Sequence, residues 1–392
     1  YIFSNKAVLL KGARCFKFEK IFNRLQYKNH LSIIETDLNS MKHNLDFFKS
    51  KIGDKTMLMV MVKAFSYGSG YREVASFLQH NRVDYLAVAF ADEGIELRKL
   101  GIHLPIMVMN PNIRAIHSMI KYKLEPEIYS LKILKEFIDE IKLSNVEDFK
   151  IHIKLDTGMH RLGFCKNDIP KLRELINSCE KIKIASVFTH LSGSDSENFD
   201  YFTHEQINEF DKNYLEICQA VKYKPIRHVL NSSGILRFPQ YKYEMVRLGI
   251  GLYGLLPNIT NELIPVAVFK SEISQIHKIN SKETVSYNRS GKINQDSVIA
   301  TIPIGYADGF DRRLGNGNWE FIVNGKKAKT IGDICMDMCM IDITNIQAKE
   351  GDEVIVFGLE NSVIKMAEKL NTIPYEIITG ISERVKRVYF EE

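Results

Sequence analysis

Lys63 is the residue whose position points most directly to chemistry, because it follows the apolar run MLMVMV of residues 57–62. A lysine at the end of a buried strand lies in a medium of low dielectric, which lowers the pKa of its amine and frees it to act as a nucleophile or a base. Such an amine can form a Schiff base with an aldehyde cofactor. Alone, the position is also typical of a lysine that extends its charge from a barrel rim into water. The neighbouring motifs therefore have to decide between the two interpretations.

Three short segments combine glycine with hydroxyl or backbone donors. They are SYGSG at 66–70, NSSG at 231–234 and LGIG at 248–251. Backbone N–H groups and hydroxyls in loops of this kind cradle phosphate groups. One such segment is usually only a turn, but three of them at the ends of predicted strands indicate a phosphate site.

Further polar residues lie at the ends of predicted strands. Arg161 follows the apolar run at 149–155, and His190 ends the run at 182–189. The set is completed by Asn231, Ser232 and Ser233 after the seventh run and by Arg247 inside the eighth. Function collects at the carboxyl ends of the strands in a barrel, so we expect these side chains to share one face.

Eight short apolar runs recur between residues 57 and 250, and amphipathic segments separate them. Segments such as 71–80, 92–100, 131–143 and 202–222 carry apolar residues at helical spacing. Parallel strands need helical crossovers, and eight strand–helix units are the count that a (β/α)8 barrel requires. A doubly wound parallel sheet is the alternative. The eight runs are 57–62, 85–90, 105–110, 124–129, 149–155, 182–189, 226–230 and 244–250.

After about residue 264 the pattern becomes β-branched or alternating, and only 362–370 is typical of a helix. The Asn-Gly of VNGK at 323–326 predicts a hairpin turn. The fold class is therefore α/β, a TIM-like (β/α)8 barrel followed by a mostly β C-terminal domain. The expected domains are an N-terminal extension (1–29), the barrel (30–264) and the β domain (265–392), with a strand at 31–38 that could pair with the β domain.

Composition excludes several classes of function. The chain has 392 residues and a net charge of +5, without a dense Lys/Arg block, which argues against nucleic-acid binding. No window approaches the roughly 20 apolar residues of a membrane span. The six cysteines show no paired spacing, and Cys335 and Cys339 lack nearby histidines, so no metal site is expected. Reduced thiols in a cytoplasmic protein are the preferred interpretation.

From about residue 31 to 390 these motifs resemble, in register, the alanine racemases, enzymes that use pyridoxal 5'-phosphate (PLP). The resemblance implies that Lys63, in VKAFSYG, holds PLP and that Tyr67 contacts its phosphate. It assigns further phosphate contacts to the Asn-Ser pair Asn231 and Ser232, to the backbone of Gly249 and Ile250, and to Tyr375 in NTIPYEI.

Arg247 is the residue for which the resemblance implies the most chemistry. It would face the pyridine nitrogen of PLP, and because a guanidinium only donates, that nitrogen would stay unprotonated and the cofactor would be a weaker electron sink. His190 would orient Arg247 from behind. Arg161, in DTGMHRLG, would lie near the phenolic oxygen of PLP and the substrate carboxylate, steadied by Lys154, which the family often carries as a carbamate.

The β domain would supply the other half of the site. By resemblance, Tyr287 in VSYNR is the second catalytic base and Tyr306 in PIGYADG lies at the mouth of the site. The backbone of Met336 would meet the substrate carboxylate, with Asp337 beside it. The implied reaction is two-base racemisation of L- and D-alanine for peptidoglycan, with Lys63 and Tyr287 on opposite faces of the cofactor. The β domain of one chain would cover the barrel of another in a head-to-tail homodimer.

The departures from the family pattern are modest. The family commonly has Asn, Ala and His where this chain has Phe65, Ser66 and Ser69, and glycine where it has His160 and Asn288. None of these changes removes a group that carries out chemistry, although they put pocket shape and turnover in question. Alternative functions are a serine or broad-specificity racemase, a decarboxylase of the same fold, and a PLP carrier without turnover.

The N-terminal segment has a resemblance of its own. The sequence AVLLKGARCFKFEKIFNRL at 7–25 is similar to the C-terminal end of the Mur ligase that adds D-alanyl-D-alanine to the cell-wall precursor. This similarity predicts the racemase half of a ligase–racemase fusion. A disordered extension is the alternative.

Overall fold

The computed structural model describes residues 31–256 and 262–391. Its contacts divide into two compact units. The barrel unit holds residues 35–268, 357–381 and the end of the chain from 389, and the β unit holds residues 269–356, 382–388 and the segment before residue 35. The boundary predicted at residue 264 remains a prediction.

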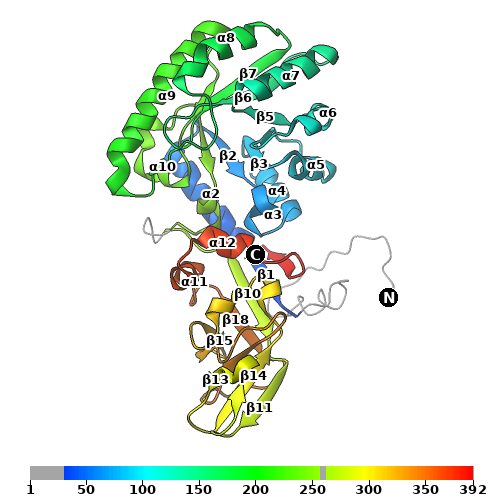
Figure 1. Ribbon diagram of the computed structural model, residues 1–392, viewed down its shortest axis with the longest axis vertical. Helices are drawn as coiled ribbons and strands as arrows, with labels where there is room; N and C mark the ends of the chain where they lie inside the picture. The colour runs from blue at the N-terminus through cyan, green and yellow to red at the C-terminus, as the bar shows by residue number, and fades with distance from the viewer. Residues whose placement is uncertain (1–30, 257–261, 392) are drawn as a thin grey trace. The chain divides into compact units, whose positions relative to one another are not determined.

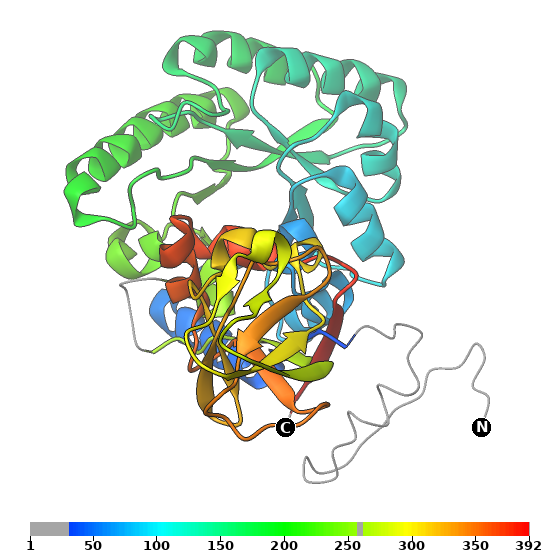
Figure 2. The same cartoon turned by 60° about the horizontal axis from the view of Figure 1, so that its bottom comes forward.

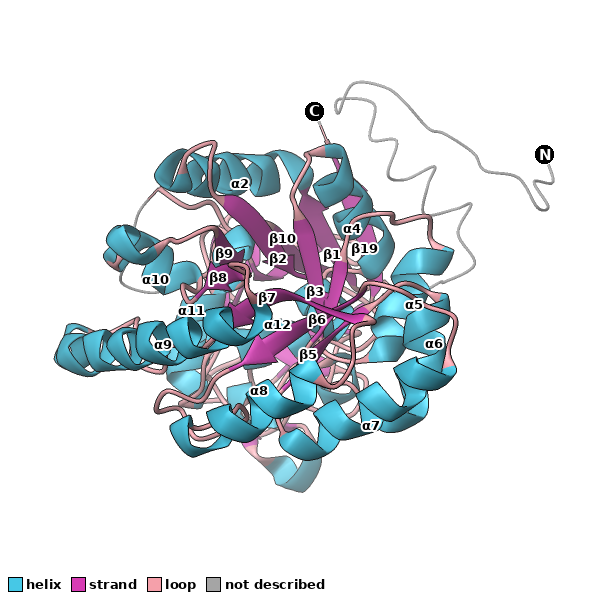
Figure 3. Ribbon diagram, turned by 90° about the horizontal axis from the view of Figure 1, so that it is seen from above, coloured by secondary structure: helices cyan, strands magenta, loops and turns pink. Residues whose placement is uncertain are grey.

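The barrel unit contains a parallel eight-stranded sheet in the order β8-β7-β6-β5-β4-β3-β2-β9. The predicted barrel is confirmed, and each of the eight apolar runs contains one of these strands (Figures 1 and 3). A hydrogen bond of 3.0 Å from the backbone N–H of Arg247 to the carbonyl of Leu230 links the last strand to the chain that follows β8. The strands are β2 (Met57–Met61), β3 (Tyr85–Val88), β4 (Ile106–Val108), β5 (Glu125–Ile128), β6 (Phe149–Lys154), β7 (Ile182–Phe188), β8 (Ile226–His228) and β9 (Met245–Leu248).

Helices surround this sheet, as Figure 3 shows, and local sequence sets their ends. In α7 (Leu131–Leu143) the hydroxyl of Ser130 accepts a hydrogen bond from the N–H of Ile133, and the buried side chains recur at helical spacing. Asp37 caps α2 (Leu38–Ile52) in the same way. The other α-helices of the barrel unit are α3 (Lys63–Tyr67), α4 (Tyr71–His80), α5 (Ala91–Lys99), α6 (Ile116–Lys121), α8 (Ile169–Asn177), α9 (Asp200–Val221), α10 (Ser232–Arg237), α11 (Val363–Leu370) and α12 (Pro374–Thr379).

The β unit is built mainly from antiparallel strands (Figure 2, yellow and orange). A six-stranded sheet has the order β16-β15-β18-β10-β1-β19, and a three-stranded sheet has the order β11-β14-β17. The indole N–H of buried Trp319 donates to the carbonyl of Val356 at 2.8 Å inside this unit. The strands are β1 (Ile33–Asp37), β10 (Ala267–Glu272), β11 (Gln275–Ile279), β12 (Thr284–Val285), β13 (Gly291–Lys292), β14 (Ser297–Ile302), β15 (Glu320–Val323), β16 (Lys326–Lys329), β17 (Cys339–Asp342), β18 (Glu353–Phe357) and β19 (Lys386–Phe390).

The hairpin predicted at 323–326 is confirmed. Val323 pairs with Lys326, and the two residues between them, Asn324 and Gly325, both have positive φ, at 49° and 73°. A two-residue turn with two positive φ angles matches the right-handed twist of the flanking strands. The predicted helix at 362–370 is also present as α11, whereas α12 was not predicted.

Two further observations concern the described residues. None of their helices is both long enough and apolar enough to cross a membrane. The five described cysteines are all free thiols.

We predict that Gly325→Val lowers the free energy of unfolding by about 1–2 kcal/mol, because a residue with a Cβ atom is strained at this positive φ. No atom lies within 4 Å of the added Cβ, so the loss measures backbone strain and not a clash. Urea unfolding followed by circular dichroism measures the effect. Lys326→Val, which places the same side chain on the neighbouring strand residue, is the matched control and is expected to stay within about 0.5 kcal/mol of the parent. Equal losses in both variants would contradict the turn assignment.

Candidate active site

Lys63 begins a turn of unusual backbone conformation directly after β2. The four residues after it, Ala64 to Tyr67, all have φ between 51° and 55°, which is a left-handed turn built from non-glycine residues. Each such residue costs about 1–2 kcal/mol relative to a right-handed turn, and strain of this kind persists only where the surroundings hold it. No local sequence pattern predicts this left-handed turn.

Contacts from three other parts of the barrel unit hold the left-handed turn in place. The carboxylate of Glu93 accepts a 2.8 Å hydrogen bond from the N–H of Ala64. The carbonyl of Ile378 in α12 comes so close to Gly68 that a Cβ there would lie 2.1 Å from its oxygen. The hydroxyl of Tyr389 donates to the carbonyl of Ser69. The position of Lys63 is therefore fixed by the tertiary structure and not by local preference.

The environment of Lys63 favours the neutral amine. Burial lowers the pKa of Lys63 most, and the positive charge of Arg161 lowers it further. Glu93 opposes this shift, and Lys154 and Glu127 have smaller effects of opposite sign. A lysine whose pKa is lowered has a larger fraction of its amine free to react near neutral pH. This is the behaviour that the sequence predicted for Lys63.

Four hydroxyl-bearing side chains and the backbone of Gly249 lie beside this turn. The ring of Tyr67 lies 4.8 Å from that of Tyr253 and 5.9 Å from that of Tyr375. A Cβ on Gly249 would lie 2.9 Å from the hydroxyl oxygen of Tyr67 and 3.8 Å from that of Ser232. The space that glycine leaves open is thus bordered by hydroxyl donors, which fits a phosphate group.

The segment after β8 gives this cradle its shape. The Oγ atom of Ser232 accepts hydrogen bonds from the N–H groups of Gly249 (2.9 Å) and Gly251 (3.3 Å). Asn231 caps α10 through its Oδ1 atom, which accepts from the N–H of Gly234 and from the hydroxyl of Ser194, both at 2.9 Å. Because its Oγ already accepts from two N–H groups, Ser232 has its own O–H free to donate.

The guanidinium of Arg247 is buried, with 3% of the residue exposed. Its Nη1 donates to Nδ1 and to the carbonyl of His228, both at 2.8 Å. Its Nη2 donates to the carbonyls of Thr189 (2.8 Å) and Val229 (3.1 Å). Burial lowers the pKa of Arg247 to about 10, so the group keeps its charge at neutral pH. The Nε–H has no hydrogen-bond acceptor within residues 31–256 and 262–391, and it is the donor left for a bound group.

His190, which the sequence singled out as the partner of Arg247, makes a weaker contact than expected. Its Nδ1 lies 3.5 Å from Nη2, whereas His228 takes a 2.8 Å hydrogen bond. Burial and the charges of Arg247 and Arg161 hold the pKa of His190 well below its ordinary value, so the ring is neutral. The sequence analysis missed His228, although its place three residues before Asn231 on an inward-facing strand position could have indicated it.

Lys154 is paired with a carboxylate that the sequence analysis did not single out. Its Nζ donates to Oε1 of Glu127 at 2.9 Å, and neither side chain is more than 5% exposed. The other carboxylate oxygen of Glu127 is buried and has no hydrogen-bond partner. Burial raises the pKa of Glu127 to about 7 in spite of Lys154. The carbamate that the family resemblance suggests for Lys154 remains a prediction.

Arg161 lies in the loop after β6 and is exposed. Its charge acts on Lys63, Glu127 and His190, which places it at the same end of the barrel. The barrel unit therefore brings together the residues that the sequence assigned to it, which are Lys63, Tyr67, Lys154, Arg161, His190, Asn231, Ser232, Arg247, Gly249, Ile250 and Tyr375.

The β unit presents its assigned residues on its surface. Tyr287, Tyr306 and Met336 are 68%, 43% and 54% exposed. Tyr287 lies between two residues of positive φ, Ser286 and Asn288. The side chain of Ser286 is anchored by a 2.9 Å hydrogen bond to the carbonyl of Asp333.

A close backbone approach places Tyr306 beside Met336 in the β unit. A Cβ on Gly305 would lie 2.3 Å from the carbonyl oxygen of Met336, and the N–H of Ala307 donates to that oxygen at 3.0 Å. Arg384 connects the two segments, with Nε on buried Asp308 and Nη2 on Asp337, both at 2.7 Å. Asp337 thus anchors the loop that carries Met336.

Two family models match this chain. The model of the alanine racemase N-terminal domain matches residues 36–257, and that of the C-terminal domain matches residues 266–389. Alanine racemase of Clostridium novyi is 39% identical over 374 residues, and alanine racemase 1 of Clostridium acetobutylicum is 37% identical over 375 residues; each match covers 91% of this chain and 95% of the relative.

Solved structures give the same result. The alanine racemase of Clostridium difficile has a TM-score of 0.85 and 35% identity, over 92% of this chain and 96% of that one. The alanine racemase of Bacillus anthracis, solved with bound L-Ala-P, has a TM-score of 0.85 and 31% identity, over 92% and 95% of the two chains.

The chain is an isomerase that combines a TIM-like barrel with a mostly β second domain. It belongs to the alanine racemase family, and its reaction is the racemisation of alanine. The Mur ligase resemblance at 7–25 lies outside the described residues, and the family models, which begin at residue 36, give it no support.

The pairing of Glu127 with Lys154 leads to a stability prediction. Glu127→Gln leaves the Lys154 ammonium buried without a counter-charge, and we expect the free energy of unfolding to fall by about 3 kcal/mol. The double variant Glu127→Gln/Lys154→Gln should lose less than the sum of the two single variants, because neither charge is then left alone. Urea unfolding of the four proteins gives both numbers.

The control for this cycle is the exposed pair of Lys171 and Glu174, whose atoms approach to 2.7 Å. Glu174→Gln should change the free energy of unfolding by less than about 1 kcal/mol. If Glu127→Gln were as mild as Glu174→Gln, the buried pair would contribute no more than a surface one.

Proposed function

We propose that this protein racemises alanine with PLP held by Lys63 and with Lys63 and Tyr287 as the two bases. The observation that carries the proposal is the convergence of the lowered pKa of Lys63, the hydroxyl-lined cradle at Gly249 and the buried Arg247 at one end of a single barrel. Tyr67, Ser232 and Tyr375, with the backbone of Gly249 and Ile250, would hold the phosphate. PLP, when bound, supplies an electron-accepting ring that stabilises the negative charge left at Cα when the proton is removed.

The residues of this chain carry out the remaining steps. In the proposal, Lys63 removes or returns the Cα proton on one side of the substrate, and the hydroxyl of Tyr287 does so on the other. Arg161 binds the substrate carboxylate together with the backbone of Met336, and Tyr306 narrows the entrance. The Nε–H of Arg247 would be the donor to the ring nitrogen and, because a guanidinium only donates, would leave that nitrogen unprotonated. This would limit the electron-accepting strength of the ring and disfavour side reactions such as transamination.

Conversion of L-alanine into D-alanine by the purified protein, measured with a D-amino-acid oxidase, tests the proposal. L-serine in parallel distinguishes a broad-specificity racemase, because a single hydroxyl changes binding by only about 1–3 kcal/mol in a small pocket. The PLP-carrier alternative is less suitable, since the C-terminal family domain matches residues 266–389. We propose that the product supplies peptidoglycan synthesis in the cytoplasm. The fusion to a Mur ligase remains a prediction from residues 7–25.

The place of PLP can be tested directly. Reduction of the holoenzyme with borohydride, followed by peptide mapping, is expected to find the pyridoxyl group on Lys63, because burial and neighbouring positive charge favour its neutral amine. Lys154 provides an internal control, since it lies nearby but is paired with Glu127. Label on Lys154 or on any other lysine would contradict the assignment.

We further propose that the active unit is a head-to-tail homodimer in which Tyr287 reaches the barrel of the partner. The exposure of Tyr287, Tyr306 and Met336 supports this arrangement, because a closed active site excludes water from its reacting groups and a partner would cover these residues. Two-fold symmetry would then create two identical composite sites.

Subunit mixing tests the composite site. Lys63→Ala and Tyr287→Ala chains are each expected to be inactive, and their mixture should recover activity, because one of the two sites in a heterodimer holds both intact residues. Racemisation is measured before and after mixing, and subunit exchange is checked by mass spectrometry. Mixing Lys63→Ala with Arg247→Ala serves as the control and should not recover activity, since both residues belong to the same barrel. An absence of recovery despite proven exchange would show that Tyr287 acts within its own chain.

A further inference from the structure

A line of polar side chains runs through the barrel, where bulky apolar residues usually fill the interior. Its members lie on four neighbouring strands: Glu125 on β5, His152 on β6, Ser186 on β7 and His228 on β8. His152, Ser186 and His228 are fully buried, and Glu125 is 9% exposed. The site described above uses only the last of them, through its contact with Arg247.

Consecutive hydrogen bonds join these residues into one chain. Nη1 of Arg247 lies 2.8 Å from Nδ1 of His228, and Nε2 of His228 lies 2.7 Å from Oγ of Ser186. Ser186 Oγ lies 2.6 Å from Nδ1 of His152, whose Nε2 lies 2.9 Å from Oε2 of Glu125. This hydrogen-bond chain therefore connects the guanidinium of Arg247, in the proposed cofactor site, to the carboxylate of Glu125, which lies two residues before Glu127 on β5.

The two ends of the hydrogen-bond chain, Arg247 and Glu125, differ in whether they donate or accept hydrogen bonds. A guanidinium only donates hydrogen bonds, and an ionised carboxylate only accepts them, whereas a neutral imidazole and a hydroxyl do both. Burial would raise the pKa of Glu125, but the hydrogen bond from His152, the charge of Lys150 and a hydrogen bond from Tyr85 bring it below its ordinary value. Burial and the charge of Arg247 keep the pKa of His228 well below its ordinary value, so this ring is neutral.

With both imidazole rings neutral and Glu125 ionised, only one arrangement of protons satisfies every link. Arg247 donates to Nδ1 of His228, so the proton of that ring is on Nε2 and is donated to Ser186. Ser186 then donates to Nδ1 of His152, whose Nε2–H donates to Glu125. The reverse arrangement would set two donors against each other at Arg247 and two acceptors at Glu125, and each buried mismatch costs about 1–3 kcal/mol.

We propose that Glu125, His152 and Ser186 are positioning residues for Arg247, and that they act by fixing the tautomer of His228 through this one-way hydrogen-bond chain. His228 then always offers the lone pair of Nδ1 to Nη1. With Nη1 and Nη2 both engaged, the guanidinium is held in one orientation and its Nε–H is aimed in one direction. The consequence for catalysis rests on the proposed function, in which that Nε–H meets the cofactor ring.

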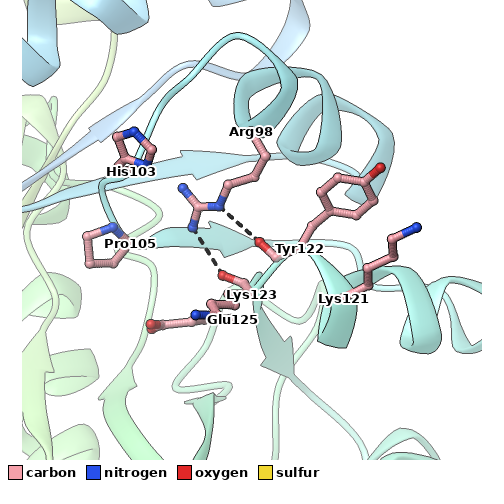
Figure 4. A pocket seen from close by; sticks show the side chains of 7 residues that line it. All are labelled: Arg98, His103, Pro105, Lys121, Tyr122, Lys123 and Glu125. Atoms are coloured by element: carbon pink, nitrogen blue, oxygen red, sulfur yellow. Dashed lines mark hydrogen bonds between the residues drawn. The ribbon is translucent and has the colours of Figure 1, made fainter.

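Glu125, at the end of the hydrogen-bond chain away from Arg247, lies at a pocket. Glu125 lines a pocket of about 470 Å³ together with residues of the segments before β4 and β5, as Figure 4 shows. In this pocket Arg98 donates through Nε to the carbonyl of Tyr122 at 2.9 Å and through Nη2 to that of Lys123 at 3.0 Å. Arg98 is thus engaged with backbone carbonyls, while Oε2 of Glu125 accepts from His152.

Neutron diffraction from crystals of the wild-type holoenzyme, soaked in deuterium oxide, tests the proton arrangement directly and independently of activity. Deuterium is expected on Nε2 of both His228 and His152 and on Ser186 Oγ, directed at His152. A deuteron on Nδ1 of either histidine, or on the carboxyl of Glu125, would overturn the proposal. This result stands even if the protein proves to racemise a different substrate.

Substitution of Ser186 tests the positioning role. Ser186→Ala removes both central links, and we expect kcat to fall about tenfold with KM changed less than about twofold, because a lost buried hydrogen bond acts on the orientation of Arg247 and not on substrate binding. Ser186→Thr retains a hydroxyl and should recover most of this loss. The absorption band of the bound cofactor should shift in Ser186→Ala, since the donor to its ring nitrogen is less well held.

Ser271→Ala is the matched control, because it removes a buried serine hydroxyl that lies 2.9 Å from that of Ser32 in the β unit. It should leave kcat and the absorption band unchanged. If Ser186→Ala changed kcat no more than Ser271→Ala, or if Ser186→Thr failed to recover activity, the positioning role would be wrong. Wild-type protein without alanine racemase activity would instead refute the proposed function and leave the neutron result to decide the hydrogen-bond chain.

Discussion

The placement of a charged guanidinium inside the barrel is the constraint on which much of this structure depends. Arg247 is 3% exposed, and a buried charge is tolerated only when hydrogen bonds replace its lost hydration. The structure meets this need with carbonyls of Thr189, His228 and Val229, which lie where β7 and β8 end. The backbone where β7 and β8 end therefore has two roles, since it follows the strands of the sheet and also supplies the carbonyls that accept from Arg247.

The same constraint explains the polar interior of the barrel. His228 has to stay neutral to accept from Arg247, and its other nitrogen then needs an acceptor in a region closed to water. Ser186, His152 and Glu125 extend that requirement across the barrel until it ends at a carboxylate that lines a pocket of about 470 Å³. Lys154 and Glu127 form a separate buried pair beside this chain. Polar groups buried in this way specify one arrangement of side chains, since any other leaves a donor or an acceptor unpaired.

Strain is concentrated where the proposed chemistry takes place. The left-handed turn after Lys63 and the positive φ angles around Tyr287 lie at the two residues proposed as bases, one in each unit. Strained backbone persists only where the surroundings over-determine it, and at Lys63 those surroundings include α12, from a part of the chain more than 300 residues away. The position of Lys63 therefore depends on contacts from distant parts of the chain and not only on its neighbours in sequence.

The sequence by itself determined the elements and the family of this protein, because both depend on local patterns. Apolar runs of the right length placed the eight barrel strands, Asn324 and Gly325 placed a hairpin, and the motifs around Lys63, Arg161 and Arg247 indicated the alanine racemases. The tertiary structure alone decided how those residues are held. The turn after Lys63 opposes the intrinsic preference of Ala64 to Tyr67, so no propensity could predict it. The roles of His228, Glu127 and Glu125 depend on which inward-facing side chains meet across neighbouring strands, and barrel closure sets that pairing.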